Sequence, residues 1–246
     1  MDPLGPYQPL NELARGGMGV VYRARDTRSG ELVALKVLLD LACDLELLER
    51  FGREVEVAGE VEHPHLVRVL DADLRPPRPW AAFELVEGGT LERRVLRDGP
   101  LPWREAVRIV SEVAAGVSAA HEKGLLHRDI KPANVLLGPA GAKLADFGLV
   151  KDLDRETLTQ TGATLGTPAY LAPEQVGSEK ARWGPATDVY GLAAAKARTC
   201  DRCSRRGCEP SPTRAACGRR PTRCGSAFRR ASASWAWAAG RRRGGR

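Results

Sequence analysis

Cysteine is nearly absent from most of this 246-residue chain, because the first 194 residues contain only Cys43. The other five lie further on, at Cys200, Cys203, Cys208, Cys217 and Cys224. A single thiol cannot form a disulfide within its own part of the chain, and such cysteine usage is typical of a reducing compartment. The sequence therefore gives no support for a disulfide-stabilised fold in this region.

Long apolar runs are absent as well, since no stretch of about 18 apolar residues occurs. The first ten residues, MDPLGPYQPL, also lack the basic and apolar regions of a secretion signal. Hydrophobic residues nevertheless make up 43% of the chain, which supports a globular core. These features predict a cytoplasmic protein without a membrane segment.

Acidic residues are scarce from Ala195 onward, where 14 arginines and one lysine accompany only two acids. The whole chain has a formal charge of +7, so the residues before Ala195 are acidic overall. Positive charge spread over the whole chain would favour nucleic acid or a membrane surface as a partner. Because the surplus is confined to the tail, the sequence predicts no specific nucleic-acid partner.

Strand-like runs separated by glycines fill residues 7 to about 40. VVYRA and LVALKVLL are such runs, and the turn at Ser29-Gly30 lies between them. They predict an antiparallel sheet. The pattern then predicts a helix from about residue 45 to 60 and two further strands, LVRVL and PWAAFELV.

After Glu87-Gly88-Gly89 the apolar spacing becomes helical. One face of a long predicted helix is marked by Ala106, Ile109, Val110, Val113, Val117 and Ala120. Short apolar strands then flank polar loops in GLLHRDIKPANVLL and AKLADFGLV. Loops present side chains to ligands, so we expect the chemistry there.

These loops contain the most specific strings in the chain, HRDIKPAN at 127–134 and DFG at 146–148. Together they resemble the catalytic core of protein kinases, most closely the bacterial-type serine/threonine kinases. The resemblance extends from about Tyr7 to Leu192 and implies a two-lobed α+β fold. It implies a small antiparallel β lobe in residues 1–86 and a helical lobe, which is incomplete, in residues 87–194.

The resemblance implies catalytic roles for four side chains. Asp129 would orient the substrate hydroxyl and accept its proton, while Lys131 would contact the γ-phosphate of ATP and indicates Ser/Thr rather than Tyr specificity. Asn134 and Asp146 would hold Mg²⁺, which prefers oxygen ligands. The implied cofactors are ATP and Mg²⁺, and the implied partners are proteins with Ser or Thr hydroxyls.

ATP-binding residues are implied in the β lobe and at its border. Lys36 in VALKVL matches the lysine that contacts the α- and β-phosphates, and Glu54 matches its carboxylate partner better than Glu56 or Glu60 does. The glycine-rich segment ARGGMGVV departs from the family pattern at Ala14, where the first glycine would be. The remaining implied ATP-binding residues are Gly16, Gly19, Val21, Ala34, Glu84, Val86 and Leu136.

The segment between Asp146 and Glu174 ends in GTPAYLAPE and resembles the activation segment of these kinases. Thr159 and Thr161 are its candidate phosphorylation sites, and Arg128 carries a guanidinium suited to a phosphate. A threonine-rich flexible loop without a regulatory role is the simpler alternative.

The resemblance stops after about Ala194. Asp188, in TDVYGL, matches the residue that holds the backbone of the catalytic loop, but the further helices of the family are replaced by an Arg- and Cys-rich sequence without periodicity. Residues 195–246 are therefore expected to be a disordered tail, and a reading-frame shift in a GC-rich gene would explain it. Zinc binding by its cysteines and nucleic-acid binding by its arginines are the alternatives.

The sequence thus predicts a protein serine/threonine kinase domain whose activity in this chain is low or absent, because the helical lobe is incomplete. Two alternatives stay open: a non-catalytic nucleotide-binding fragment, and an adaptor that acts through the basic tail. The adaptor would show salt-sensitive binding that does not need Asp129.

Overall fold

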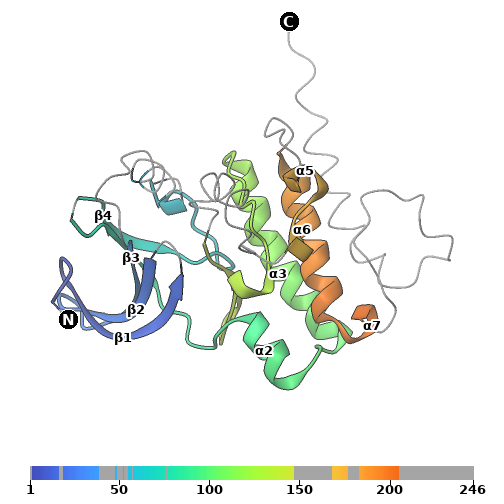
Figure 1. Cartoon of the computed structure of the whole chain (residues 1–246), viewed down its shortest axis with the longest axis horizontal. Coiled ribbons are helices and arrows are strands. Elements are labelled where there is room, and N and C mark those ends of the chain that lie inside the picture. Colours follow the sequence, from blue (N-terminus) through green and yellow to red (C-terminus); the bar gives the residue numbers. More distant parts are fainter. Residues whose placement is uncertain are drawn as a thin grey trace, which may run out of the picture. The chain divides into compact units, whose positions relative to one another are not determined.

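The computed structural model describes residues 2–16, 19–38, 48, 52, 55–56, 58–75, 77–146, 168–176 and 183–204, and the structural statements below refer to these residues. Figure 1 shows the strands of the first part gathered in one sheet and the helices of the second part packed together. The predicted α+β fold is confirmed, because an antiparallel sheet precedes a helical region along the chain.

Five antiparallel strands form the sheet, in the order β1-β2-β3-β5-β4. Their bounds are β1 (Tyr7–Gly16), β2 (Gly19–Asp26), β3 (Leu32–Leu38), β4 (Val69–Asp73) and β5 (Trp80–Glu84). Buried positions alternate with less buried ones along β2 and β3, as expected when one face of each strand lies in a core. The strands predicted within residues 7–40 are therefore confirmed.

One face of the sheet is covered by its own apolar cluster, which includes Val20, Val33 and Leu35. The rings of Tyr7 and Trp80 complete it in an edge-to-face contact, with centroids 5.1 Å apart. These residues alternate with the ones predicted to bind ATP. The core thus fixes the strands and leaves the opposite face for the site.

The helix predicted between residues 45 and 60 is described only in part. Residues 48, 52, 55–56 and 58–59 are helical. Val55 is buried together with Leu38 and Ala81, so this helix packs against β3 and β5.

The helical region contains α2 (Leu91–Asp98), α3 (Trp103–Glu122), α5 (Pro173–Val176), α6 (Pro185–Thr199) and α7 (Asp201–Ser204). The apolar face predicted for α3 is buried and packs against α6. The short α2 was not predicted, because Leu91 is its one fully buried residue and no apolar period marks it. None of the described helices combines the length and apolarity that crossing a bilayer requires.

A two-stranded hairpin, β6 (Val135–Gly138) and β7 (Gly141–Leu144), lies between the catalytic loop and Asp146. Its second strand contacts both α3 and the loop ahead of β4. In that loop, the amide of Val67 donates to the carbonyl of Leu144 at 2.9 Å. The hairpin therefore joins the sheet to the helical region.

The expectation of a disordered tail from Ala195 is wrong for its first ten residues. α6 continues to Thr199, α7 follows it, and Ala195, Thr199, Cys200 and Cys203 are all buried. The backbone of Leu101 explains this order, because it donates to the carbonyl of Thr199 at 2.7 Å and accepts from the amide of residue 201 at 2.9 Å. Residues 205–246 lie outside the described part of the chain.

Candidate active site

The catalytic loop, residues 127–134, lies between α3 and β6 and is held by Asp188 of α6. The Asp188 carboxylate accepts hydrogen bonds from the amides of His127 at 2.9 Å and Arg128 at 2.6 Å. His121, in the last turn of α3, places its Nε2 2.7 Å from the same carboxylate. Arg128 has a φ of 63°, which is unusual for a residue with a side chain, so the bonds from Asp188 stabilise a strained loop. The predicted contact between Asp188 and the loop is confirmed.

Asp188 is ionised although only 1% of its surface is exposed. Burial by itself would raise the pKa of its carboxyl group. The hydrogen bonds from His121 and from the two loop amides outweigh burial and lower the pKa below its ordinary value. A buried negative charge with these donors therefore anchors the loop.

Asp129 forms a hydrogen-bonded group with two other residues of the loop. The Nδ2 of Asn134 donates to the backbone oxygen of Asp129 at 2.8 Å and to its Oδ2 at 3.1 Å. The Nζ of Lys131 lies 3.0 Å from the same Oδ2. A short 3₁₀ helix, Pro132–Asn134, turns the chain back so that Asn134 reaches Asp129. The structure thus brings three of the predicted catalytic residues together.

Asp146 follows β7 and forms an ion pair with Lys36 of β3, with 2.9 Å between Oδ1 and Nζ. The positive charge of Lys36 is the main reason that the pKa of Asp146 is lowered. Ala145 joins Asp146 to the catalytic loop, since its amide donates to the carbonyl of Asn134 at 2.8 Å and its own carbonyl lies 3.0 Å from His127 Nε2. Asp146 is therefore ionised and positioned next to the loop.

Three predicted site residues, Glu54, Thr159 and Thr161, lie outside the described residues. The pairing of Lys36 with Glu54 stays a prediction. The partner that the structure shows for Lys36 is Asp146.

The described residues of the glycine-rich segment lie at the end of β1 and the start of β2, where Ala14 lies opposite Val21 and Gly16 opposite Gly19. A Cβ atom at Gly19 would overlap the backbone oxygen of Val37, so β2 and β3 approach closely there only because residue 19 is glycine. A Cβ atom at Gly16 would meet nothing within 4 Å. Ala14 lies in extended β1, so the alanine causes no backbone strain.

The sheet face opposite the core carries Val21, Ala34 and Lys36, which are half-buried. Val21 lies opposite Lys36, and Ala34 lies opposite Phe83. Directly opposed residues of an antiparallel pair point to the same face. The face therefore presents apolar side chains beside a cation.

The other predicted nucleotide-binding residues lie where the sheet connects to the helices. Glu84 is the last residue of β5. Val86, two residues later, lies close to the end of β6, because a Cβ atom at Gly138 would be 3.1 Å from a Val86 methyl group. Leu136 lies in β6, and its backbone pairs with Thr90, just ahead of α2. The connecting segment thus runs beside the strand that carries Leu136.

The model of the protein kinase domain family matches residues 7–200. The chain belongs to this family. It is 42% identical over 188 residues to the serine/threonine-protein kinase PknL of Mycobacterium tuberculosis, which covers 76% of this chain and 47% of that protein. It is 40% identical over 196 residues to the serine/threonine-protein kinase AfsK of Streptomyces coelicolor, which covers 78% of this chain and 24% of that protein.

A probable serine/threonine-protein kinase, PkwA of Thermomonospora curvata, is 39% identical over 193 residues, which are 78% of this chain and 26% of that protein. The chain therefore spans between about a quarter and a half of the length of these curated relatives. The family match ends at residue 200, close to the last residue of α6.

Two side chains that hold this kinase site together were missed in the sequence. His121 contacts Asp188, and the side-chain Nε2 of Gln175 donates to the backbone carbonyl of Arg128 at 2.7 Å. His121 comes directly after Ala120, the last residue of the apolar face of α3, and is the only histidine in that helix. This position was the one sign in the sequence that could have pointed to it. For Gln175, which lies 47 positions from Arg128, the sequence offered no comparable signal.

Proposed function

We propose that this kinase domain binds MgATP and transfers the γ-phosphoryl group to Ser or Thr hydroxyls of proteins. The observation that supports this most directly is the hydrogen-bonded group of Asp129, Lys131 and Asn134. Asp146, with Lys36 beside it, is tied to that group through Ala145. Phosphoryl transfer depends mainly on positioning and on electrostatic stabilisation of the phosphoryl oxygens. These residues provide a base, two cations and two oxygen donors for a metal.

The chemistry of Asn134 and Asp146 fits Mg²⁺. Mg²⁺ prefers oxygen ligands, and the lowered pKa of Asp146 keeps its carboxylate charged. Asn134 bonds to Asp129 through Nδ2, so its side-chain oxygen is the atom suited to a cation. Within the described residues no three His, Cys, Asp or Glu side chains gather as a metal site, so the nucleotide phosphates would supply further ligands. Bound Mg²⁺ would neutralise charge on those phosphates.

In this proposal each side chain has one task. Asp129 orients the substrate hydroxyl and accepts its proton. Lys131, beside Asp129, neutralises charge on the γ-phosphate, and Lys36 has enough donors to contact the α- and β-phosphates as well as Asp146. Val21, Ala34 and Leu136 would enclose the adenine. The names of the relatives and Lys131 both favour Ser and Thr as acceptors.

We propose that turnover by this chain is slow. α6 holds the catalytic loop through Asp188, but at positions 195 and 199 it buries one small side chain, Ala195, and one polar side chain, Thr199. Each leucine-sized side chain that is missing from a core forgoes about 1.5–3 kcal/mol of burial. The Thr199 hydroxyl donates a hydrogen bond to the carbonyl of Ala195, which satisfies the hydroxyl and adds no apolar contact.

A thermal-unfolding experiment on the purified 246-residue chain tests nucleotide binding. At an MgATP concentration of about 100 times Kd, binding should stabilise the folded chain by about 2.7 kcal/mol, which raises Tm by roughly 5–10 °C. Turnover is measured in parallel with a basic protein as the acceptor. No rise in Tm together with no turnover would contradict the proposal, whereas a rise in Tm without turnover would favour the non-catalytic alternative.

Replacing Lys36 by methionine should weaken nucleotide binding by about 10–100-fold, because a charge-assisted contact to the phosphates is lost. The same change removes the counter-charge of Asp146, so the pKa of Asp146 should rise toward its ordinary value. Binding by Lys36→Met and the parent chain is measured by titration with a fluorescent ATP analogue. The same titration of Glu54→Gln tests the predicted partner of Lys36. If Glu54→Gln binds like the parent chain while Lys36→Met does not, the pairing of Lys36 with Glu54 is wrong.

A further inference from the structure

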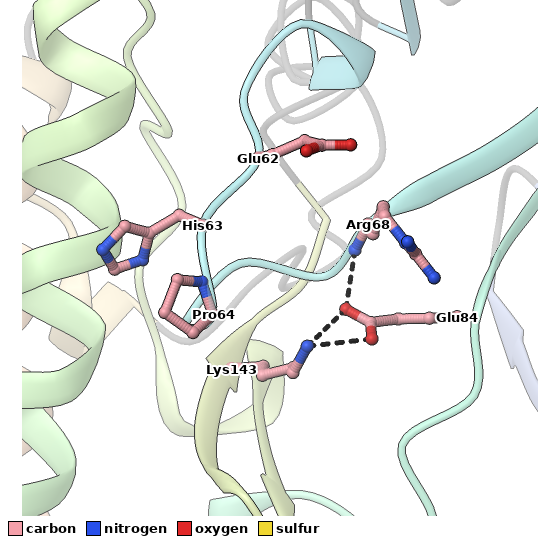
Figure 2. Close-up of a pocket in the computed structure, with 6 residues that line it drawn as sticks. All are labelled: Glu62, His63, Pro64, Arg68, Glu84 and Lys143. Carbon is pink, nitrogen blue, oxygen red and sulfur yellow. Dashed lines mark hydrogen bonds and ion pairs between the residues drawn. The ribbon is translucent and has the colours of Figure 1, made fainter.

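The side chain of Glu84 does not point along the sheet but reaches across to β7 (Figure 2). Its two oxygens lie 2.7 and 2.8 Å from the Nζ of Lys143, and the amide of Arg68 donates to Oε1 at 2.9 Å. About four fifths of each charged side chain is buried. The carboxylate therefore has three short contacts, two of them to a residue 59 positions away.

This contact joins the two parts of the proposed adenine site. Glu84 lies opposite Val33 at the end of β5, one position from Phe83, which lies opposite Ala34. Lys143 lies opposite Leu136 in the β6–β7 hairpin. The ion pair thus connects the strand beside one apolar wall to the hairpin that carries the other.

The segment after Glu84 is held at its far end by the same hairpin. The amide of Leu137 donates to the carbonyl of Gly89 at 2.9 Å. Gly88 lies so close to the backbone oxygen of Leu137 that a Cβ atom there would overlap it. Residues 85–88, which connect the sheet to the segment ahead of α2, therefore run between two fixed points on one hairpin.

The Lys143–Glu84 pair lies beside a cavity of about 300 Å³, lined by Glu62, His63, Pro64, Arg68, Glu84 and Lys143 (Figure 2). Glu84 is the only predicted nucleotide-binding residue among these six. The lining contains charges of both signs, so it favours neither an anion nor a cation as a ligand.

We propose that Lys143 is a positioning residue for nucleotide binding. Through its ion pair with the Glu84 carboxylate, Lys143 sets the distance between Leu136 and the sheet face that carries Val21 and Ala34. This inference rests on the proposed MgATP binding and adds a residue that touches neither nucleotide nor substrate. Without Lys143, the Glu84 carboxylate keeps the hydrogen bond from the Arg68 amide, and the hairpin loses its side-chain link to the end of β5. The adenine site then becomes less well defined, while the phosphate-binding residues are unchanged.

The test compares Lys143→Met with the parent chain for a fluorescent ATP analogue and for inorganic tripolyphosphate, both with Mg²⁺. Lys143→Met should weaken binding of the ATP analogue about 5–10-fold and leave tripolyphosphate within about twofold. Lys143→Arg, which restores the charge, should recover most of the loss. A general loss of folding would weaken the binding of both ligands equally. Equal losses of affinity for the ATP analogue and for tripolyphosphate would therefore overturn the proposal.

Glu84→Gln and the double variant test the pair itself. Glu84→Gln keeps an acceptor for the Arg68 amide, and it should resemble Lys143→Met, while the double variant should be no weaker than either single change. Lys123→Met is the matched control, since Lys123 is exposed at the end of α3 and should bind nucleotide like the parent chain. Losses that simply add in the double variant would overturn the coupling.

Amide hydrogen exchange separates this inference from the proposed function. In Lys143→Met the amides of residues 85–88 should exchange faster even without nucleotide, because one of the two fixed points is lost. If the parent chain binds no nucleotide, the proposed function is wrong. The positioning role of Lys143 is then still tested by the rate of amide exchange in residues 85–88. Unchanged exchange in residues 85–88 would refute it.

Discussion

Replacing Asp129 by asparagine should reduce phosphoryl transfer by about 10²–10⁴-fold, the range expected when a general base is lost. Asparagine keeps nearly the same shape and can still accept a hydrogen bond from Asn134, but it cannot accept the substrate proton and carries no charge for Lys131. Nucleotide binding should remain within about twofold, because Asp129 contacts no phosphate in the proposed complex.

The measurement uses radiolabelled ATP and a basic acceptor protein, with the ATP analogue titrated separately. Asp98→Asn is the matched control, because Asp98 lies at the exposed end of α2 and pairs there with Arg94 and Arg97. Equal turnover by Asp129→Asn and the parent chain would show that Asp129 is not the base.

Replacing Asp188 by asparagine should lower the free energy of unfolding by about 3 kcal/mol, because a buried carboxylate that accepts three hydrogen bonds is lost. For a chain of this size the change corresponds to a fall in Tm of roughly 6–12 °C. Asparagine has one acceptor oxygen, so at least one of the amides of His127 and Arg128 loses its partner. The left-handed conformation of Arg128 should then relax, and phosphoryl transfer should fall with it.

The pH dependence of this effect follows from the pKa of Asp188, which is lower in the folded chain than its ordinary value of 3.8. A lowered pKa means that the carboxylate stabilises the fold fully above pH 3.8 and that this contribution is lost as the pH falls further, through the folded pKa. The difference in stability between the parent chain and Asp188→Asn should therefore shrink as the pH falls below 3.8. Denaturant titrations at several pH values test this, and a difference that does not change with pH would refute it.

Much of the secondary structure around the site could be predicted from local patterns in the sequence. Strand-prone runs bounded by glycines in residues 19–38 predicted β2 and β3. Helical spacing in residues 106–120 predicted α3, because a core on one side of a helix imposes its period on the sequence. The strings HRDIKPAN and DFG identified the family. HRDIKPAN is also the catalytic loop, and it is short enough that Asp129, Lys131 and Asn134 meet within a few residues.

Which distant charges form ion pairs depends on tertiary packing and could not be predicted from the sequence. Lys36 meets Asp146 across 110 positions and Glu84 meets Lys143 across 59, because β3, β5 and the β6–β7 hairpin are brought side by side by packing that local spacing does not encode. The same reason applies to residues 195–204, whose composition indicates disorder. They are ordered because the backbone of Leu101 bonds to both sides of Cys200 and because the small side chains of this segment are buried. Neither contact can be read from a stretch rich in arginine and cysteine.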